Sequence, residues 1–308
     1  MGGAKIFVTG ASGMLGAACC FELRGMFDVT GSYLSHNVQI EGVETIRLGL
    51  GNRQDTITAI ASAKPELIIN TAAMTAVDLC ESERETAYNA NVICAENAAL
   101  AAKECGAKLI HMSTDYVFDG KKGMYSETDR PKPLGYYAET KLLGEGAVSK
   151  ANPEAAIVRA TIIGWNPLGA QINIAPRIVD ALRNGIDMPL FTDQYSSPIL
   201  VNDLADIFAE IFGKGLSGIC HAGTKGKASK YELGLEICRA FDFEPSALDK
   251  TSFSEFERSG MLKAKRPLDT SLSTAKLEKA LGREMPALAD CIKRFRQLEE
   301  EKYLDNFK

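Results

Sequence analysis

The first half of the chain alternates short, nearly continuous apolar runs with longer segments in which apolar residues recur at helical spacing. The apolar runs predict strands at residues 4–10, 28–34, 43–49, 66–73, 107–113 and 155–161. The segments between them predict helices at residues 14–24, 54–63, 83–105 and around Tyr137. Strands that are apolar on both faces and separated by helices are typical of a parallel sheet covered on both sides. We therefore expect an α/β fold with a Rossmann-type doubly wound parallel sheet.

After residue 162 the alternation loosens into loop-like stretches. Helices are expected there at residues 175–184, 202–213, 231–241 and 273–281. Such a region often forms a smaller lobe at the carboxyl ends of the strands, where ligands bind in open α/β sheets. The predicted organisation is a dinucleotide-binding domain and a smaller C-terminal substrate-binding lobe. The domain spans residues 1–162, completed by about residues 196–222, and the lobe spans residues 163–195 and 223–308.

Composition narrows the class of partner. The chain carries 35 basic and 40 acidic residues, a net charge of −5, and its basic residues are scattered. Neither a nucleic acid nor a membrane surface is therefore expected as a partner. Residues 1–10 lack the regions of a signal peptide, and the eight cysteines form no CxxC motif. We expect a cytoplasmic protein with reduced thiols and, with only three histidines, no bound metal.

Three glycines follow the first strand directly, in "TGASGMLG". Glycines at this point permit a tight turn, a close approach of backbone to a pyrophosphate, and close packing of the next helix. Amide groups at the start of that helix would then point at the phosphates. The sequence therefore predicts a dinucleotide site whose contacts from this segment are Gly10, Ser12, Gly13, Met14, Leu15 and Gly16.

A tyrosine and a lysine lie one helical turn apart in "PLGYYAETKLLGE". At about 100° per residue, Tyr137 and Lys141 share a helix face, whereas Tyr136 is rotated off it. Taken alone, the pair also suits a solvated helix face. Reduction of a ketone by hydride needs a proton for the developing alkoxide. A nearby ammonium favours the phenolate, so Lys141 is expected to lower the pKa of Tyr137.

The glycine spacing, "NTAA" at residues 70–73 and the Tyr137–Lys141 pair together resemble the short-chain dehydrogenase/reductase superfamily in its extended branch. "STDYVFDG" at residues 113–120 resembles the serine/threonine site of that branch. The resemblance implies that Thr114, Tyr137 and Lys141 are catalytic, with Tyr137 as the proton donor. It also implies that Ala72, Ala73, Tyr137 and Lys141 contact the cofactor.

Further segments resemble the RmlD-like dTDP-4-dehydrorhamnose reductases from end to end. They are "NTAAMTAVDLCESE" (70–83), "YAETKLLGE", "DQYSSP" (193–198) and "RPLDTSLSTAKLEKALG" (266–282). This resemblance implies NAD(P)H-dependent reduction of a nucleotide-activated 4-keto-6-deoxysugar, as in dTDP-rhamnose and polysaccharide biosynthesis. The residues it places at the nucleotide-sugar are Thr114, Tyr116, Trp165, Asn173, Gln194 and Arg266.

The end of the second predicted strand bears on the choice of cofactor. NAD-preferring folds place an acidic residue there, but "GSYLSH" (31–36) has neither a carboxylate nor an arginine. A 2′-phosphate would have only Ser32, Ser35 or His36. NADP(H) is therefore favoured over NAD(H), because no carboxylate repels the phosphate.

Two other functions stay open. A nucleotide-sugar epimerase or dehydratase uses the same tyrosine and lysine, although Thr114 is followed by Asp115 and Tyr116 and not by the Asp-Glu pair of dehydratases. A non-catalytic subunit is the other alternative, because the regulatory subunit of methionine adenosyltransferase resembles this family too. Some relatives are magnesium-dependent dimers, which leaves a homodimer open, but the sequence shows no compact carboxylate cluster for a metal.

Overall fold

One large parallel sheet runs through the computed structural model, which describes residues 3–169, 173–258 and 262–308. In its described part the sheet has eight strands in the order β10-β6-β5-β4-β1-β2-β3, with β9 pairing beside the end of β6. Their bounds are β1 Lys5–Thr9, β2 Asp28–Tyr33, β3 Glu44–Arg47, β4 Leu67–Asn70, β5 Lys108–Thr114, β6 Ala156–Ile163, β9 Pro198–Leu200 and β10 Gly218–His221. The α/β, doubly wound prediction is confirmed.

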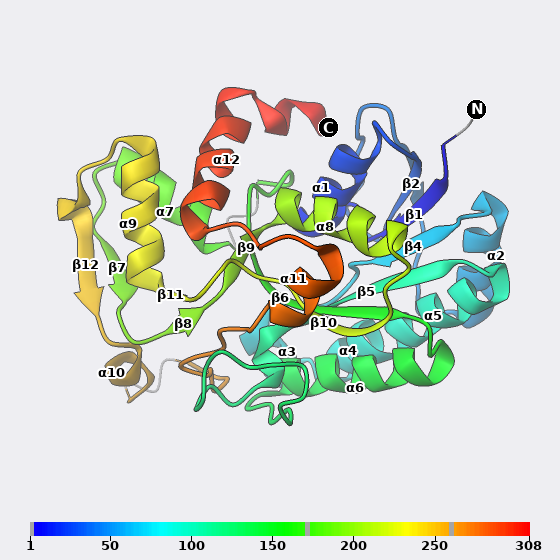
Figure 1. Ribbon diagram of the computed structural model, residues 1–308, viewed down its shortest axis with the longest axis horizontal. Coiled ribbons are helices and arrows are strands. Elements are labelled where there is room, and N and C mark those ends of the chain that lie inside the picture. Colours follow the sequence, from blue (N-terminus) through cyan, green and yellow to red (C-terminus); the bar gives the residue numbers. More distant parts are fainter. Residues whose placement is uncertain (1–2, 170–172, 259–261) are drawn as a thin grey trace.

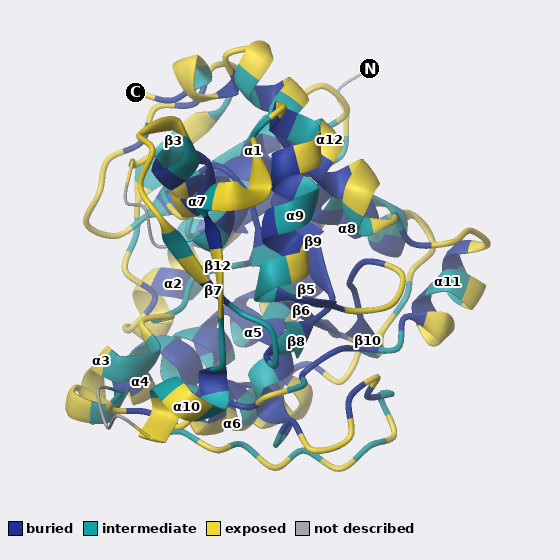
Figure 2. Ribbon diagram, turned by 90° about the vertical axis from the view of Figure 1, so that its left-hand side faces the viewer, coloured by how far each residue is buried: buried dark blue, intermediate teal, exposed yellow. Residues whose placement is uncertain are grey.

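Side-chain alternation along the strands sends alternate residues into two cores. In β1, Ile6 and Val8 join the core on the side of α1 (Met14–Leu23) and α8 (Val201–Gly213). Phe7 joins the opposite core, formed with α2 (Arg53–Ala63), α5 (Cys94–Cys105) and α6 (Tyr136–Ala151). Figure 1 shows α1 and α8 over one face and α5 and α6 over the other, and Figure 2 shows the buried strands between them.

Two small sheets lie outside the large one. β7 (Met188–Phe191) pairs in parallel with β12 (Leu248–Thr251), and β8 (Tyr195–Ser196) pairs with β11 (Ala228–Ser229) in the antiparallel sense. Beside them lie α7, α9 and α10 at the left of Figure 1, and α12 packs against α9 at the top. The bounds of these helices are Ile174–Arg183, Lys230–Phe241, Phe253–Arg258 and Leu288–Glu300, and α11 (Ala275–Leu281) lies beside β10.

The structure adds helices that the sequence analysis did not predict. The expected helix at residues 83–105 is α4 (Arg84–Tyr88), a π-helical turn (Asn89–Ile93) and α5, preceded by the short helix α3 (Val77–Ser82). The helix α12 was also missed, although its buried residues recur at helical spacing: Cys291, Ile292, Phe295 and Leu298. It packs against α9 and β9 and so joins the C-terminal part of the chain to the large sheet.

Candidate active site

The glycine turn between β1 and α1 requires glycine at two positions. Gly10 has φ +74°, and a Cβ there would lie 3.0 Å from the Ala72 backbone. A Cβ on Gly16 would lie 2.1 Å from the Gly10 carbonyl oxygen. These contacts press the turn against the end of β4. A side chain at either position would therefore push the turn and the first turn of α1 apart from the segment that follows β4.

The first turn of α1 fits a phosphate group. Gly13 is the N-cap of α1, no side chain caps the helix, and its first turn has no acidic residue. Ser12, Gly13 and Met14 reach the surface, whereas Leu15 is buried and offers only its backbone amide. Unpaired amides at a helix N-terminus bind anions. The turn can therefore hold the diphosphate of a dinucleotide, as the glycine spacing predicts.

Ser32 does not lie where the sequence analysis expected it. Its side chain is 1% exposed inside β2, so the hydroxyl does not reach a phosphate at the surface. Both faces of the sheet are covered at this point, so Gly31 and Ser32 are both buried, while Tyr33 is half-buried at the end of the strand. Ser32 contributes its carbonyl instead, which accepts a hydrogen bond from the Ala11 amide at 2.7 Å.

Thr114, Tyr116 and Tyr137 come together at the carboxyl end of β5. The Thr114 side chain interacts with the Tyr137 phenol, and the Tyr116 ring meets the Tyr137 ring edge-on at 6.2 Å. Tyr136 points elsewhere: its ring lies under the Arg84 guanidinium, 4.6 Å from the centroid. The contacts therefore place Tyr137, and not Tyr136, beside Thr114.

Lys141 is buried behind this group, and its ammonium donates to the Met112 carbonyl at 2.7 Å. Burial lowers the pKa of Lys141 to about 8, and the Glu145 carboxylate opposes this shift. The expected lowering of the Tyr137 pKa is not found. Burial raises the pKa of Tyr137, and the neighbouring Thr114 only partly offsets that rise. The phenol therefore keeps its proton at neutral pH, as a proton donor must.

A buried ion pair that the sequence analysis missed lies under Lys141. Arg159 of β6 donates to both oxygens of Glu145, Nε–Oε1 at 2.8 Å and Nη2–Oε2 at 2.6 Å. Ser113 also donates to Glu145, and Arg159 Nη1 lies 3.5 Å from His221 Nε2. Glu145 follows Lys141 by one helical turn, which was the signal available in the sequence. The network ties α6 to β5, β6 and β10.

A second buried acid lies beside Thr114. The Asp115 carboxylate accepts hydrogen bonds from Thr270 and, at 3.2 Å, from Thr114. Burial raises the pKa of Asp115, while Thr161, Thr270 and the nearby Lys230 lower it. Lys230 and Thr270 both come from the C-terminal part of the chain, so Asp115 joins that part to the end of β5.

Arg266 lies at the rim of the site. Its Nη2 donates to Asp78 Oδ2 at 2.6 Å, and the Ala264 amide donates to Asp78 Oδ1 at 3.0 Å. Burial raises the pKa of Asp78, but these hydrogen bonds outweigh it and lower that pKa. Arg266 acts electrostatically on Tyr116, which connects it to Tyr137. An adjacent cavity of about 760 Å³ has Lys121, Lys263, Lys265 and Arg266 in its lining.

The other three predicted substrate residues have their polar groups engaged within the protein. The Trp165 ring stacks on Phe295 at 4.3 Å, and its N–H donates to the Phe295 carbonyl. Asn173 caps α7 through Ala175 and donates to the Ile162 carbonyl at 2.9 Å. Gln194 donates to the Pro267 carbonyl at 3.3 Å. Trp165, at 7% exposure, is a packing residue in this structure.

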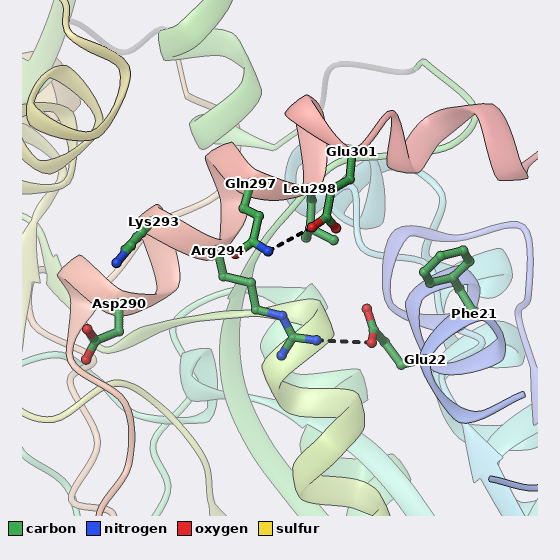
Figure 3. A pocket seen from close by; sticks show the side chains of 8 residues that line it. All are labelled: Phe21, Glu22, Asp290, Lys293, Arg294, Gln297, Leu298 and Glu301. Carbon is green, nitrogen blue, oxygen red and sulfur yellow. Dashed lines mark hydrogen bonds and ion pairs between the residues drawn. The ribbon is translucent and has the colours of Figure 1, made fainter. Parts of the chain in front are cut away.

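Another cavity lies away from this group, between α1 and α12 (Figure 3). It has a volume of about 410 Å³, and its central Arg294 is bound by Glu22, Asp203 and Asp206. Within the described ranges, no cluster of His, Cys, Asp and Glu side chains is placed to hold a metal ion. In the same ranges, no helix has the length and apolar character needed to cross a membrane.

Comparison with known proteins identifies the family. The model of the RmlD substrate binding domain family matches residues 4–299. The chain belongs to this family. It is similar to the dTDP-4-dehydrorhamnose reductase of Mycobacterium tuberculosis, with 33% identity over 82% of this chain and 81% of that protein. It is also similar to methionine adenosyltransferase 2 subunit beta of Danio rerio, with 29% identity over 91% of this chain and 84% of that protein.

A solved structure of an RmlD relative matches the whole fold. The dTDP-4-dehydrorhamnose reductase of Bacillus anthracis, determined in complex with NADP, superposes with a TM-score of 0.83 at 26% identity. The superposition covers 96% of this chain and 99% of that one. The predicted resemblance to the RmlD-like reductases is therefore confirmed.

Proposed function

We propose that this RmlD-family protein is an NADPH-dependent reductase of a nucleotide-activated 4-keto-6-deoxysugar, similar to dTDP-4-dehydrorhamnose. The observation that carries the proposal is the placement of Thr114 beside Tyr137, with Lys141 one helical turn away. The reductase of M. tuberculosis named above supports this substrate class. In this role the protein serves the synthesis of a deoxysugar donor for polysaccharide.

The dinucleotide supplies the hydride, and the chain holds it between the glycine turn and α6. Gly10, Ser12, Gly13 and the amides of Met14, Leu15 and Gly16 hold its diphosphate. Ala72 and Ala73 line its path at the end of β4. Lys141 binds the ribose next to the nicotinamide. The preference for NADPH over NADH belongs to this proposal.

Tyr137 provides the proton that the reduction requires. With substrate bound, the Thr114 hydroxyl would turn its single hydrogen from Asp115 to the substrate oxygen and set the distance of that oxygen from the phenol. As hydride reaches the carbonyl carbon, negative charge grows on that oxygen and the phenol proton moves to it. The burial that raises the pKa of Tyr137 keeps the phenol protonated until this moment.

The substrate lobe receives the nucleotide diphosphate. Arg266 is the expected phosphate partner, because a guanidinium binds phosphate through two parallel hydrogen bonds. The cavity of about 760 Å³ beside it has the size of a ligand site, and its lysines suit an anion. Tyr116 lies between Arg266 and Tyr137 and would contact the sugar. Contacts of Asn173 and Gln194 with the nucleotide-sugar stay predictions.

Location and oligomeric state are part of the proposal. All eight cysteines are free thiols, which supports a reducing, cytoplasmic environment. A homodimer stays a prediction. So does the division into a dinucleotide-binding domain and a substrate-binding lobe at residues 163–195 and 223–308.

The deciding experiment incubates the purified protein with NADPH and dTDP-, UDP- or GDP-activated 4-keto-6-deoxysugars. A reductase consumes NADPH and yields a hydroxyl at C4, whose configuration NMR reads. Rearrangement of the sugar without net NADPH consumption would indicate an epimerase. Retention of NADPH without turnover, together with binding to a methionine adenosyltransferase catalytic subunit, would favour the binding-subunit alternative that the D. rerio relative keeps in view.

A further inference from the structure

The end of β2 has no arginine in the sequence, but the neighbouring strand β3 places Arg47 there. β2 and β3 pair in parallel with Tyr33 opposite Arg47, so both strands end side by side. The Arg47 side chain crosses to β2, where its Nε donates to the Leu34 carbonyl at 3.1 Å. Because 13 positions separate the two residues, this cation lies outside residues 31–36 in the sequence although it reaches the end of β2 in the fold.

The Arg47 guanidinium carries a charge without a carboxylate partner among the described residues. Arg47 is exposed, and its one hydrogen bond there uses Nε, which leaves both Nη groups available. The next arginine, Arg53, is different because it pairs with Glu96 at 3.8 Å. Ser35 and His36 follow Leu34 directly, both exposed, with Ser35 Oγ 3.0 Å from His36 Nδ1. Three polar side chains therefore surround the end of β2.

This group lies on the path of a dinucleotide that starts at the glycine turn. The Ala11 amide donates to the Ser32 carbonyl at 2.7 Å, so the turn is fastened to β2 near its end. In a doubly wound fold the adenosine ribose lies beyond the end of the second strand, with its 2′ oxygen facing the residues that follow. A guanidinium there can bind a phosphate through two hydrogen bonds, which a 2′-hydroxyl does not match.

We propose that Arg47 selects NADPH over NADH by binding the 2′-phosphate of the adenosine ribose. The proposal rests on the dinucleotide site of the proposed function and names the residue that reads its cofactor. It replaces Ser32, whose buried side chain cannot perform this task. A charge-assisted hydrogen bond of this kind changes affinity about 10- to 100-fold.

The test is a fluorescence titration of the wild type, Arg47→Met and Arg53→Met with NADPH and with NADH. We expect Arg47→Met to weaken NADPH binding about 10- to 100-fold and to leave NADH binding unchanged. Arg53→Met, the matched control, should change neither. Arg47→Lys should recover part of the preference, because it keeps a point charge without the planar fork.

Several outcomes would overturn the proposal. Equal weakening of NADPH and NADH in Arg47→Met would show that Arg47 only supports the Leu34 backbone. An unchanged ratio would place the 2′-phosphate elsewhere, and failure of the wild type to bind either nucleotide would remove the site altogether. Selective loss of NADPH binding in a protein that reduces no ketosugar would leave the proposal standing and reject the reductase function alone.

Discussion

Two arginine–carboxylate pairs flank the site, and both have an N–O distance of 2.6 Å. Arg159–Glu145 lies beneath Lys141, with side chains 2% and 5% exposed, whereas Arg266–Asp78 lies at the rim, with side chains 20% and 40% exposed. The two ion pairs have the same N–O distance but differ in how much water surrounds them. The buried charges are desolvated, so each is stabilised mainly by its partner. The charges at the rim are still hydrated, so each can leave its partner at a lower cost in free energy.

This difference suits the two pairs to different tasks. Every Glu145 oxygen has a partner inside the protein, so the buried pair fixes α6, and with it Tyr137 and Lys141, against the sheet. Arg266 can exchange the Asp78 carboxylate for a phosphate at little cost, because both anions offer two oxygens. We therefore expect the buried pair to support the framework and the rim pair to take part in ligand binding.

The largest expected effect lies between the two pairs, at Tyr137. Tyr137→Phe removes the proposed proton donor and should lower kcat about 10²- to 10⁴-fold with little change in NADPH affinity. Tyr136→Phe is the matched control and should be mild, because that ring lies under Arg84. Steady-state kinetics and a fluorescence titration measure both. A larger kcat loss in Tyr136→Phe would show that the proton comes from the other tyrosine.

The buried pair should respond to the loss of one partner through stability. Arg159→Met leaves the Glu145 charge buried and unpaired, which should reduce the free energy of unfolding by about 3–5 kcal/mol. Urea denaturation measures this change. The double variant Glu145→Gln with Arg159→Met removes both charges and should recover most of the loss. Equal instability of the single and double variants would mean that packing, and not charge pairing, dominates.

The rim pair should respond through substrate binding. Arg266→Met should raise KM for the nucleotide-sugar about 10- to 100-fold, because a hydrogen bond to a charged group is lost. Its free energy of unfolding should change by less than about 1 kcal/mol. Asp78→Asn is the companion variant, since it frees Arg266 and should not raise KM. A loss of stability as large as that of Arg159→Met would contradict the contrast between the pairs.

The smallest effect concerns pH and Lys141, which lies above the buried pair. Its pKa of about 8 lies below that of an ordinary lysine, so the ammonium loses its proton as pH rises through that value. At a pH one unit above this pKa, about a tenth of the molecules keep the Lys141 ammonium charge. The affinity for NADPH should therefore fall by up to about tenfold. Titrations from pH 7 to 10 measure this. A flat profile in the wild type would show that the charge does not contribute to binding, and Lys141→Met should give one.

The same lowered pKa has a consequence for folding. Between the folded pKa of about 8 and the ordinary lysine value, the unfolded chain binds more protons than the folded one. The contribution of Lys141 to the free energy of unfolding therefore increases with pH across this window. Above the ordinary value both states are neutral at this position, and the dependence ends.

Short-range patterns determined much of this protein. Short runs rich in apolar and β-branched residues predicted β1 to β6. The signal is strongest in β4, where all four residues are buried, because a strand buried on both faces admits few polar residues. Glycine spacing predicted the turn after β1, where Gly10 and Gly16 allow no side chain. Helical geometry alone placed Tyr137 and Lys141 on one face and Tyr136 off it. These inferences involve residues within a few positions of each other, where chain geometry is predictable.

Contacts between distant segments were decided only by the tertiary structure. The pairing of β2 with β3 brought Arg47 to the Leu34 carbonyl, and the packing of α6 against the sheet joined Glu145 to Arg159 of β6. Packing against α12 turned Trp165 from an expected ligand contact into a core residue. Burial also reversed the expected direction of the Tyr137 pKa shift. Each of these depends on which surfaces meet and how much water they exclude, and a local sequence pattern contains neither quantity.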